Sequence, residues 1–180
     1  IKGRYIITPV KSGLMLIDQK RAHERVLFES YIRSFALNAP AAQRSLFPET
    51  LEMDPTDYMV LQEIADDLHT IGFDIRDGGG NTFVVHGCPL SYGNQTAREL
   101  IDKFLEQYKS TGNDLKANAR GRMASALASA NAIGYGERLT REAMRELVDK
   151  LFACEEPNYS PSGKPVVSIM VLEELEHRFR

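Results

Sequence analysis

The stretch "DQKRAHERVLFE", residues 18–29, places Asp18, Glu24 and Glu29 close to His23. Acids and a histidine this near one another can form a metal site, or they can line a charged helix that faces water. On an α-helix, Glu24 and Glu29 lie about 140° apart, and Asp18 lies roughly 16 Å from Glu29 along the axis. No pair of these acids chelates one ion from this helix alone, so a metal site needs ligands from elsewhere in the fold.

The same stretch contains opposite charges at helical spacing. Lys20–Glu24, Arg25–Glu29 and Glu29–Arg33 are all four residues apart, which is the separation of ion pairs on one helix face. From the helix geometry alone, the sequence therefore predicts a salt-bridged, solvated helix face.

The flanking segments predict an α+β fold. Alternating apolar residues and glycines predict strands, and caps such as Asp18, Asp54 and Thr140 mark where helices begin. The predicted elements follow the order ββα–βαββα–ααβα: strands 4–10 and 14–18, a helix from 19, an extended segment 45–53, a helix 55–71, two strands around the glycine turn 77–81, an amphipathic helix 96–109, a buried alanine-rich helix 122–133, a helix from 141 to about 154, a loop 157–165, a strand 166–171 and a short helix 172–179.

Composition fits an ordinary globular protein. Of the 180 residues, 43% are hydrophobic and 26% charged, and no apolar run suits a membrane span or a signal peptide. The net charge of −3 argues against a strong autonomous grip on a phosphate backbone. Cys88 and Cys154 lack C-x-x-C spacing, so we expect reduced thiols and a cytoplasmic location. Because the chain starts at Ile1, we expect it to be a fragment of a longer protein.

A second candidate site lies in "AAQRSLFPETL", residues 41–51. Gln43, Leu46, Phe47 and Pro48 resemble the Q-x-x-L-F pattern by which bacterial replication proteins dock on the sliding clamp. An extended peptide of this kind inserts two apolar side chains into a pocket while the glutamine fixes its orientation. The alternative is that Leu46 and Phe47 are core residues of a strand, and both interpretations stay open.

Taken together, the segments resemble a known family. "IDQKRAHERVLFE" is similar to the signature segment of the C-terminal dimerisation domain of MutL mismatch-repair proteins, and "GRYIITPVKSGLMLIDQ" fits the strands that lead into it. "RMASALASANAI" resembles the family's alanine-rich helix, "YSPSGKPVV" its proline–glycine loop and strand, and "HRFR" its C-terminal end. The resemblance covers essentially the whole chain.

The departures from nuclease-type members concern metal ligands. Asp18, Gln19, Glu24 and Glu29 match the nuclease motif. Other residues replace the histidines, cysteines, arginine and alanine of the pattern: Lys20, Arg21, Ser125, Ser160, Ser162 and Lys164. Zinc prefers nitrogen and sulfur ligands, and a serine hydroxyl replaces neither. The resemblance therefore implies a degenerate endonuclease site, with no catalytic residue, no metal and no cofactor in this chain.

Two alternatives remain open. The first is a metal-dependent DNA-nicking endonuclease whose lost ligands are replaced from among His23, Cys154, Glu155, Glu156 and His177. The second is a dimerising adaptor that has no role in repair.

The resemblance also implies an organisation and partners. Residues 1–50 and 121–180 would form a discontinuous dimerisation subdomain, and residues 51–120 an inserted βαββα subdomain that is external and regulatory. We expect a homodimer that binds the sliding clamp and other mismatch repair proteins, with no membrane contact. The family's ATPase domain would precede Ile1, so no ATP site is expected here. Any DNA contact would be weak or indirect, through the basic residues near the N-terminus, Lys2, Arg4, Lys11, Lys20, Arg21, Arg25 and Arg33.

Overall fold

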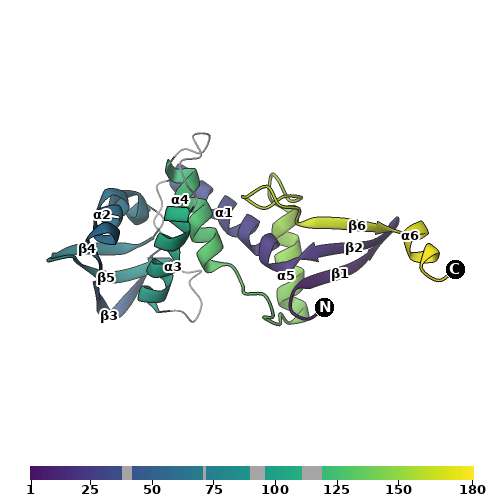
Figure 1. The fold of residues 1–180 in the computed structure, drawn as a ribbon, viewed down its shortest axis with the longest axis horizontal. Coiled ribbons are helices and arrows are strands. Elements are labelled where there is room, and N and C mark those ends of the chain that lie inside the picture. Colours follow the sequence, from purple (N-terminus) through teal and green to yellow (C-terminus); the bar gives the residue numbers. More distant parts are fainter. Residues whose placement is uncertain (38–41, 71, 90–95, 111–118) are drawn as a thin grey trace. The chain divides into compact units, whose positions relative to one another are not determined.

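The computed structural model describes residues 1–37, 42–70, 72–89, 96–110 and 119–180 (Figure 1). Its elements follow the order β1 β2 α1 β3 α2 β4 β5 α3 α4 α5 β6 α6, which is the order predicted from the sequence. The strands form two three-stranded antiparallel sheets, so the predicted α+β class is confirmed. Within the described ranges, no helix combines the length and the apolar character that crossing a membrane requires.

The chain divides into two compact units. One consists of residues 1–29 and 132–180, and the other of residues 30–131. The boundaries between these units follow residues 29 and 131, whereas the boundaries of the subdomains expected from the family follow residues 50 and 120. The functional division into dimerisation and external subdomains stays a prediction.

The first unit is a sheet covered by helices. Its sheet has the order β1-β2-β6, with Ile6 opposite Ile17 and Ile17 opposite Val167. One face packs on Ala22, Leu147 and Leu151 of the adjoining helices. The elements are β1 (Tyr5–Val10), β2 (Gly13–Asp18), the first part of α1 (Gln19–Leu37), α5 (Arg141–Phe152), β6 (Val167–Val171) and α6 (Leu172–His177).

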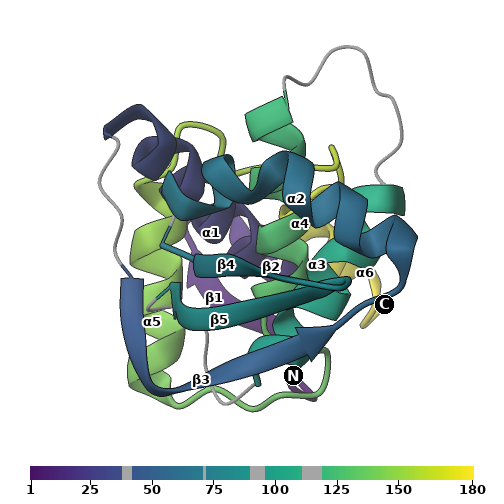
Figure 2. The same cartoon turned by 90° about the vertical axis from the view of Figure 1, so that its left-hand side faces the viewer.

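The second unit pairs a sheet of order β3-β5-β4 with helices, and Figure 2 shows α2 running along β4. Its elements are the remainder of α1, β3 (Ala42–Glu52), α2 (Pro55–Thr70), β4 (Asp74–Gly79), β5 (Thr82–Pro89), α3 (Ala97–Ser110) and α4 (Ala119–Asn131). The largest fully buried side chains of this unit are Leu51, Leu61, Leu68, Phe73, Phe83, Leu100, Ile101, Phe104, Leu105, Met123 and Leu127. The alanine-rich helix α4 is buried, as predicted, because its small side chains allow close packing.

Helices begin at the predicted caps. The Asp54 carboxylate accepts from the amides of Thr56 and Asp57 at 2.9 and 3.0 Å, and the Thr140 hydroxyl accepts from the amide of Ala143 at 3.2 Å. Each cap satisfies backbone donors that have no partner within the helix. These local bonds fix where α2 and α5 start.

Candidate functional site

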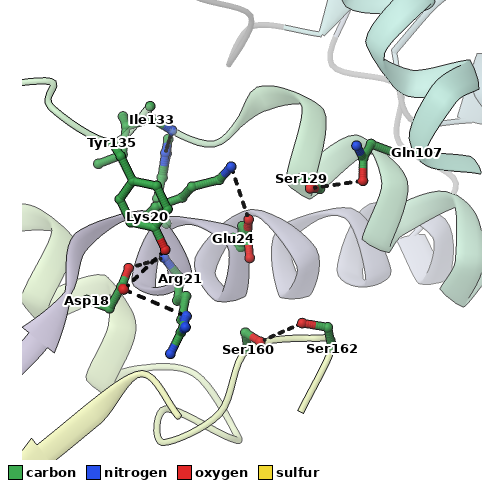
Figure 3. Close-up of polar contacts among 12 residues, drawn as sticks. Asp18, Lys20, Arg21, Glu24, Gln107, Ser129, Ile133, Tyr135, Ser160 and Ser162 are labelled. Carbon is green, nitrogen blue, oxygen red and sulfur yellow. Dashed lines mark hydrogen bonds and ion pairs between the residues drawn. The ribbon is translucent and has the colours of Figure 1, made fainter. Parts of the chain in front are cut away.

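Asp18 lies where β2 ends and α1 begins, and the residue is only 5% exposed. Its Oδ1 accepts from the Arg21 amide at 3.1 Å, which makes Asp18 the N-cap of α1, as predicted. Its Oδ2 accepts from the Tyr135 hydroxyl at 3.2 Å and lies 3.7 Å from Arg21 Nε (Figure 3). Both oxygens therefore have structural partners.

Glu24 lies six residues after Asp18, on α1. Burial raises the pKa of the Glu24 carboxyl, and the neighbouring Asp18 raises it further, while the Lys20 ammonium opposes both. Lys20 Nζ lies 3.9 Å from Glu24 Oε1 (Figure 3). The Lys20 ammonium group therefore lies beside the Glu24 carboxylate.

Glu29 binds the turn that follows α5. Its carboxylate accepts from the amides of Glu155 and Glu156 at 2.9 and 3.3 Å. Its Oε1 also lies 3.7 Å from Arg25 Nη1. Glu29 therefore joins α1 to a turn that is more than a hundred residues away in the sequence.

The prediction of a solvated helix face is wrong for these residues. The Lys20–Glu24 and Arg25–Glu29 ion pairs are present, as predicted. However, the Glu24 and Glu29 side chains are only 15% and 13% exposed, and that of Arg25 only 7%. The reason is that segments from the C-terminal part of the chain cover this face of α1.

The proline–glycine loop that carries Ser160 and Ser162 closes on itself. Ser160 is buried, and its Oγ lies 3.0 Å from Ser162 Oγ (Figure 3) and accepts from the Lys164 amide at 3.1 Å. The Gly163 amide donates to the Ser160 carbonyl at 2.9 Å, with Gly163 at a positive φ of 75°. The two hydroxyls therefore serve the loop itself. Ser125 lies half-buried on α4, in the other unit.

Next to this loop is a surface hollow of about 590 Å³, lined by residues 155–161, Gly163 and Arg25. The Arg25 Nε donates to the Tyr159 carbonyl at 2.6 Å, and Nη2 lies 3.4 Å from the exposed Glu156 carboxylate. The buried Arg25 side chain therefore holds the loop in place through Tyr159 and Glu156. No sequence pattern indicated that Arg25 would be buried.

The candidate replacement ligands are mostly engaged elsewhere. His23 Nδ1 accepts from the Ile133 amide at 3.1 Å, and burial lowers the pKa of this histidine although Glu137 opposes the shift. The buried Cys154 thiol donates to the Lys150 carbonyl at 3.3 Å. Glu155, Glu156 and His177 are exposed. Across the described ranges, no three His, Cys, Asp or Glu side chains gather in a metal-binding arrangement.

The clamp-like pattern lies in β3, which overlaps the extended segment 45–53 that the sequence predicts. The register of β3 against β5 shifts between Arg44 and Glu49, and Pro48 is exposed. The side chains of Gln43, Leu46 and Phe47 lie outside the described part of the structure.

Sequence reasoning did not single out Tyr135. Its ring lies 4.6 Å from the Arg4 guanidinium and 5.5 Å from Lys20 Nζ. No sequence pattern marks a lone tyrosine in a loop, and its contacts with Asp18 and Arg4 cross most of the chain.

Comparison with known proteins identifies the family. The sequence model of one protein family, the MutL C-terminal dimerisation domain, matches residues 1–139. The chain belongs to this family. DNA mismatch repair protein MutL of Bacteroides fragilis is 44% identical over 99% of the chain, and those of Phocaeicola vulgatus and Chlorobium limicola are 39% and 37% identical over the same share.

The chain spans only part of these relatives. It covers 29% of the length of the first two MutL proteins and 28% of the third. The resemblance inferred from the signature segments is thus confirmed at the level of the MutL C-terminal domain.

Proposed function

We propose that this chain is the homodimerisation module of a DNA mismatch repair protein, and that it dimerises through one face of the β1-β2-β6 sheet. The matching family is named for dimerisation, which supports the assembly. The observation that carries the choice of surface is an apolar sheet face that the helices of its own unit do not bury.

The two faces of this sheet differ because side chains alternate along a strand. Ile6 and Ile17 point to the helices and are buried. On the opposite side, cross-strand pairing aligns Ile7 with Leu16 and Ser168, and Pro9 with Leu14 and Met170. We call the apolar members of this side the outer apolar face: Ile7, Pro9, Leu14, Leu16 and Met170.

The outer apolar face remains half-buried or exposed, with Ile7 37% exposed. Aliphatic side chains aligned over three strands gain stability when a partner removes them from water. A two-fold dimer uses the same patch on both copies, so one apolar face is sufficient. A second copy of this chain is therefore the occupant that fits.

Sedimentation equilibrium tests this surface. Wild-type protein should sediment at about twice the 20.2 kDa of one chain. Ile7→Glu places two buried charges at the two-fold contact and should give a monomer. Ile169→Glu is the matched control, because Ile169 is exposed on the opposite side of the same sheet. Dimerisation that survives Ile7→Glu but not Ile169→Glu would exclude the outer apolar face.

We further propose that the endonuclease chemistry of nuclease-type members is degenerate here, with no catalytic residue, no resident metal and no cofactor. The available metal-ligand atoms support this proposal. By resemblance, the Ser160 and Ser162 hydroxyls stand in place of sulfur and nitrogen ligands, and they bond to each other. Lys20 adds a positive charge 3.9 Å from the Glu24 carboxylate, where it repels a cation. A separate partner would then make the incision.

Calorimetric titration with zinc and manganese tests this loss. Chelator-stripped protein should bind neither metal at tens of micromolar, and it should not nick supercoiled DNA. Tight binding that disappears in Glu24→Ala would instead support the alternative, a metal-dependent endonuclease with substituted ligands.

Docking on the sliding clamp is the second proposed role, in the cytoplasm and alongside other mismatch repair proteins. The pattern of Gln43, Leu46, Phe47 and Pro48 lies in an edge strand of the β3-β5-β4 sheet. A register shift in this strand precedes Glu49, and such irregularities redirect side chains. Replacing Gln43, Leu46 and Phe47 together by alanine should weaken clamp binding, measured by surface plasmon resonance. Glu49→Ala is the control, and equal affinity for both variants would reject the pattern.

A further inference from the structure

Arg4 is an exposed cation held by aromatic rings. Its guanidinium lies 4.6 Å from the centre of the Tyr135 ring and 5.2 Å from that of Tyr5. Among the described residues, no carboxylate lies within ion-pair distance of Arg4. The N–H groups of this arginine are therefore available to an external anion.

The acids around Arg4 are bound to other groups. Asp18 accepts from the Tyr135 hydroxyl and pairs with Arg21. Glu24 pairs with Lys20, and Glu137 accepts from the Gly134 amide at 3.2 Å. Arg4 thus has no ion-pair partner among the described residues, although the chain as a whole carries a net charge of −3.

The rings and the cation lie on segments that are tied together. The Gly136 amide donates to the Gly3 carbonyl at 2.9 Å, and the Gln19 amide donates to the Arg4 carbonyl at 2.9 Å. Gly3 has a φ of +60°, and a Cβ there would lie 2.5 Å from the Gly136 backbone. The Asp18 bond fixes the far end of Tyr135 (Figure 3). The arrangement is therefore built into the fold before any ligand arrives.

We propose that Arg4, Tyr5, Tyr135 and Lys20 form a platform that binds single-stranded nucleic acid. Arginine contributes both flat stacking and N–H donors to phosphate, and exposed tyrosine rings stack on unpaired bases. Tyr135 is 48% exposed and Tyr5 36% exposed, so a ligand can reach both residues. A duplex keeps its bases stacked on one another and offers only its phosphates. The platform goes beyond dimerisation, and binding can fail while the dimer forms, so the two proposals are tested separately.

Fluorescence anisotropy with a labelled oligothymidylate of about 12 nucleotides tests the platform, because single-strand sites span about 4–16 nucleotides. The intact chain should bind it saturably at low salt, with a salt slope near −1.4 if about two phosphates are neutralised. A duplex of the same length should bind more weakly. Sedimentation in the same buffer reports whether each variant still dimerises.

Arg4→Glu should weaken binding by about tenfold or more, because an attraction becomes a repulsion. Lys11→Glu is the matched control, with the same charge change at an exposed residue beyond the other end of β1, and should change affinity by less than about twofold. Tyr135→Ala should weaken binding by about fivefold or more through lost stacking. Tyr135→Phe keeps the ring and should bind like wild type, which separates stacking from the Asp18 bond.

Three results would overturn the platform. The first is the absence of saturable binding by the wild-type chain. The second is an equal loss in Arg4→Glu and Lys11→Glu, which would indicate a diffuse charge effect. The third is duplex affinity equal to single-strand affinity. The Tyr135→Phe and Arg4→Glu variants keep the test decisive even if Tyr135→Ala fails to fold.

Discussion

Glu29→Ala should destabilise the first unit substantially. The carboxylate accepts from two backbone amides, those of Glu155 and Glu156, at 2.9 and 3.3 Å. It also pairs with Arg25, whose side chain is only 7% exposed. The alanine variant removes all three interactions at once.

The cost follows from these contacts. Hydrogen bonds to a charged acceptor contribute about 1.5–3 kcal/mol, and a buried charge that loses its partner costs more. Glu156, 3.4 Å from Arg25 but 71% exposed, offsets part of the loss. We therefore expect about 3 kcal/mol, which corresponds to a fall in Tm of roughly 6–12 °C for a chain of this size. Glu29→Gln keeps an acceptor oxygen and should lose about half as much.

Differential scanning calorimetry measures the effect, with Glu146→Ala as the matched control. Glu146 also forms an ion pair four residues along a helix, with Lys150 at 2.6 Å, but both side chains are more than half exposed. Exposed pairs of this kind contribute little to stability. If Glu29→Ala and Glu146→Ala lowered Tm equally, the role of Glu29 as an anchor would be refuted.

Three further predictions concern titration and backbone strain. Because burial raises the pKa of Glu24, ionisation costs stability as pH rises, so Glu24→Gln should raise Tm near neutral pH and lose this advantage below about pH 4. Burial lowers the pKa of His23, so the neutral imidazole should contribute stability above about pH 6.5, and this stability should fall on acidification. The urea midpoint of His23→Gln should therefore change less with pH in this range. Gly3→Ala should cost about 1–3 kcal/mol more than Gly80→Ala in urea unfolding, since both glycines have φ near +60° but only Gly3 lies against Gly136. Equal costs for the two glycines, or unchanged pH profiles, would contradict these assignments.

Much of the fold was predictable because its signals are local. Asp18, Asp54 and Thr140 lie directly before apolar periodic segments, and each caps the helix that the sequence predicts there. The glycine turn between β4 and β5 is likewise encoded within a few residues. Helix spacing also predicted the Lys20–Glu24 ion pair. None of these features needs knowledge of the tertiary structure.

The environment of the candidate site was not predictable because distant segments create it. Helical spacing says which charges are neighbours on α1, but it says nothing of what covers them. The amides that bind Glu29 are 126 and 127 residues away in the sequence, and the hydroxyl that binds Asp18 is 117 residues away. Packing between segments this far apart in the sequence buries most of the α1 face that helical spacing alone predicts to be solvated.

The three acids of the motif therefore have separate physical roles in this chain. Asp18 begins α1 and holds Tyr135, whereas Glu29 joins the other end of this stretch to the turn after α5. These two helices form the layer that supports the inner face of the β1-β2-β6 sheet, against Ile6 and Ile17. Fixing that layer also fixes the outer apolar face, so Asp18 and Glu29 stabilise the proposed dimer surface without touching it. Glu24 accepts no comparable backbone bond among the described residues, and its ion-pair partner is the Lys20 ammonium. The contacts of Asp18 and Glu29 thus support the proposed dimer surface independently of any metal chemistry at Glu24.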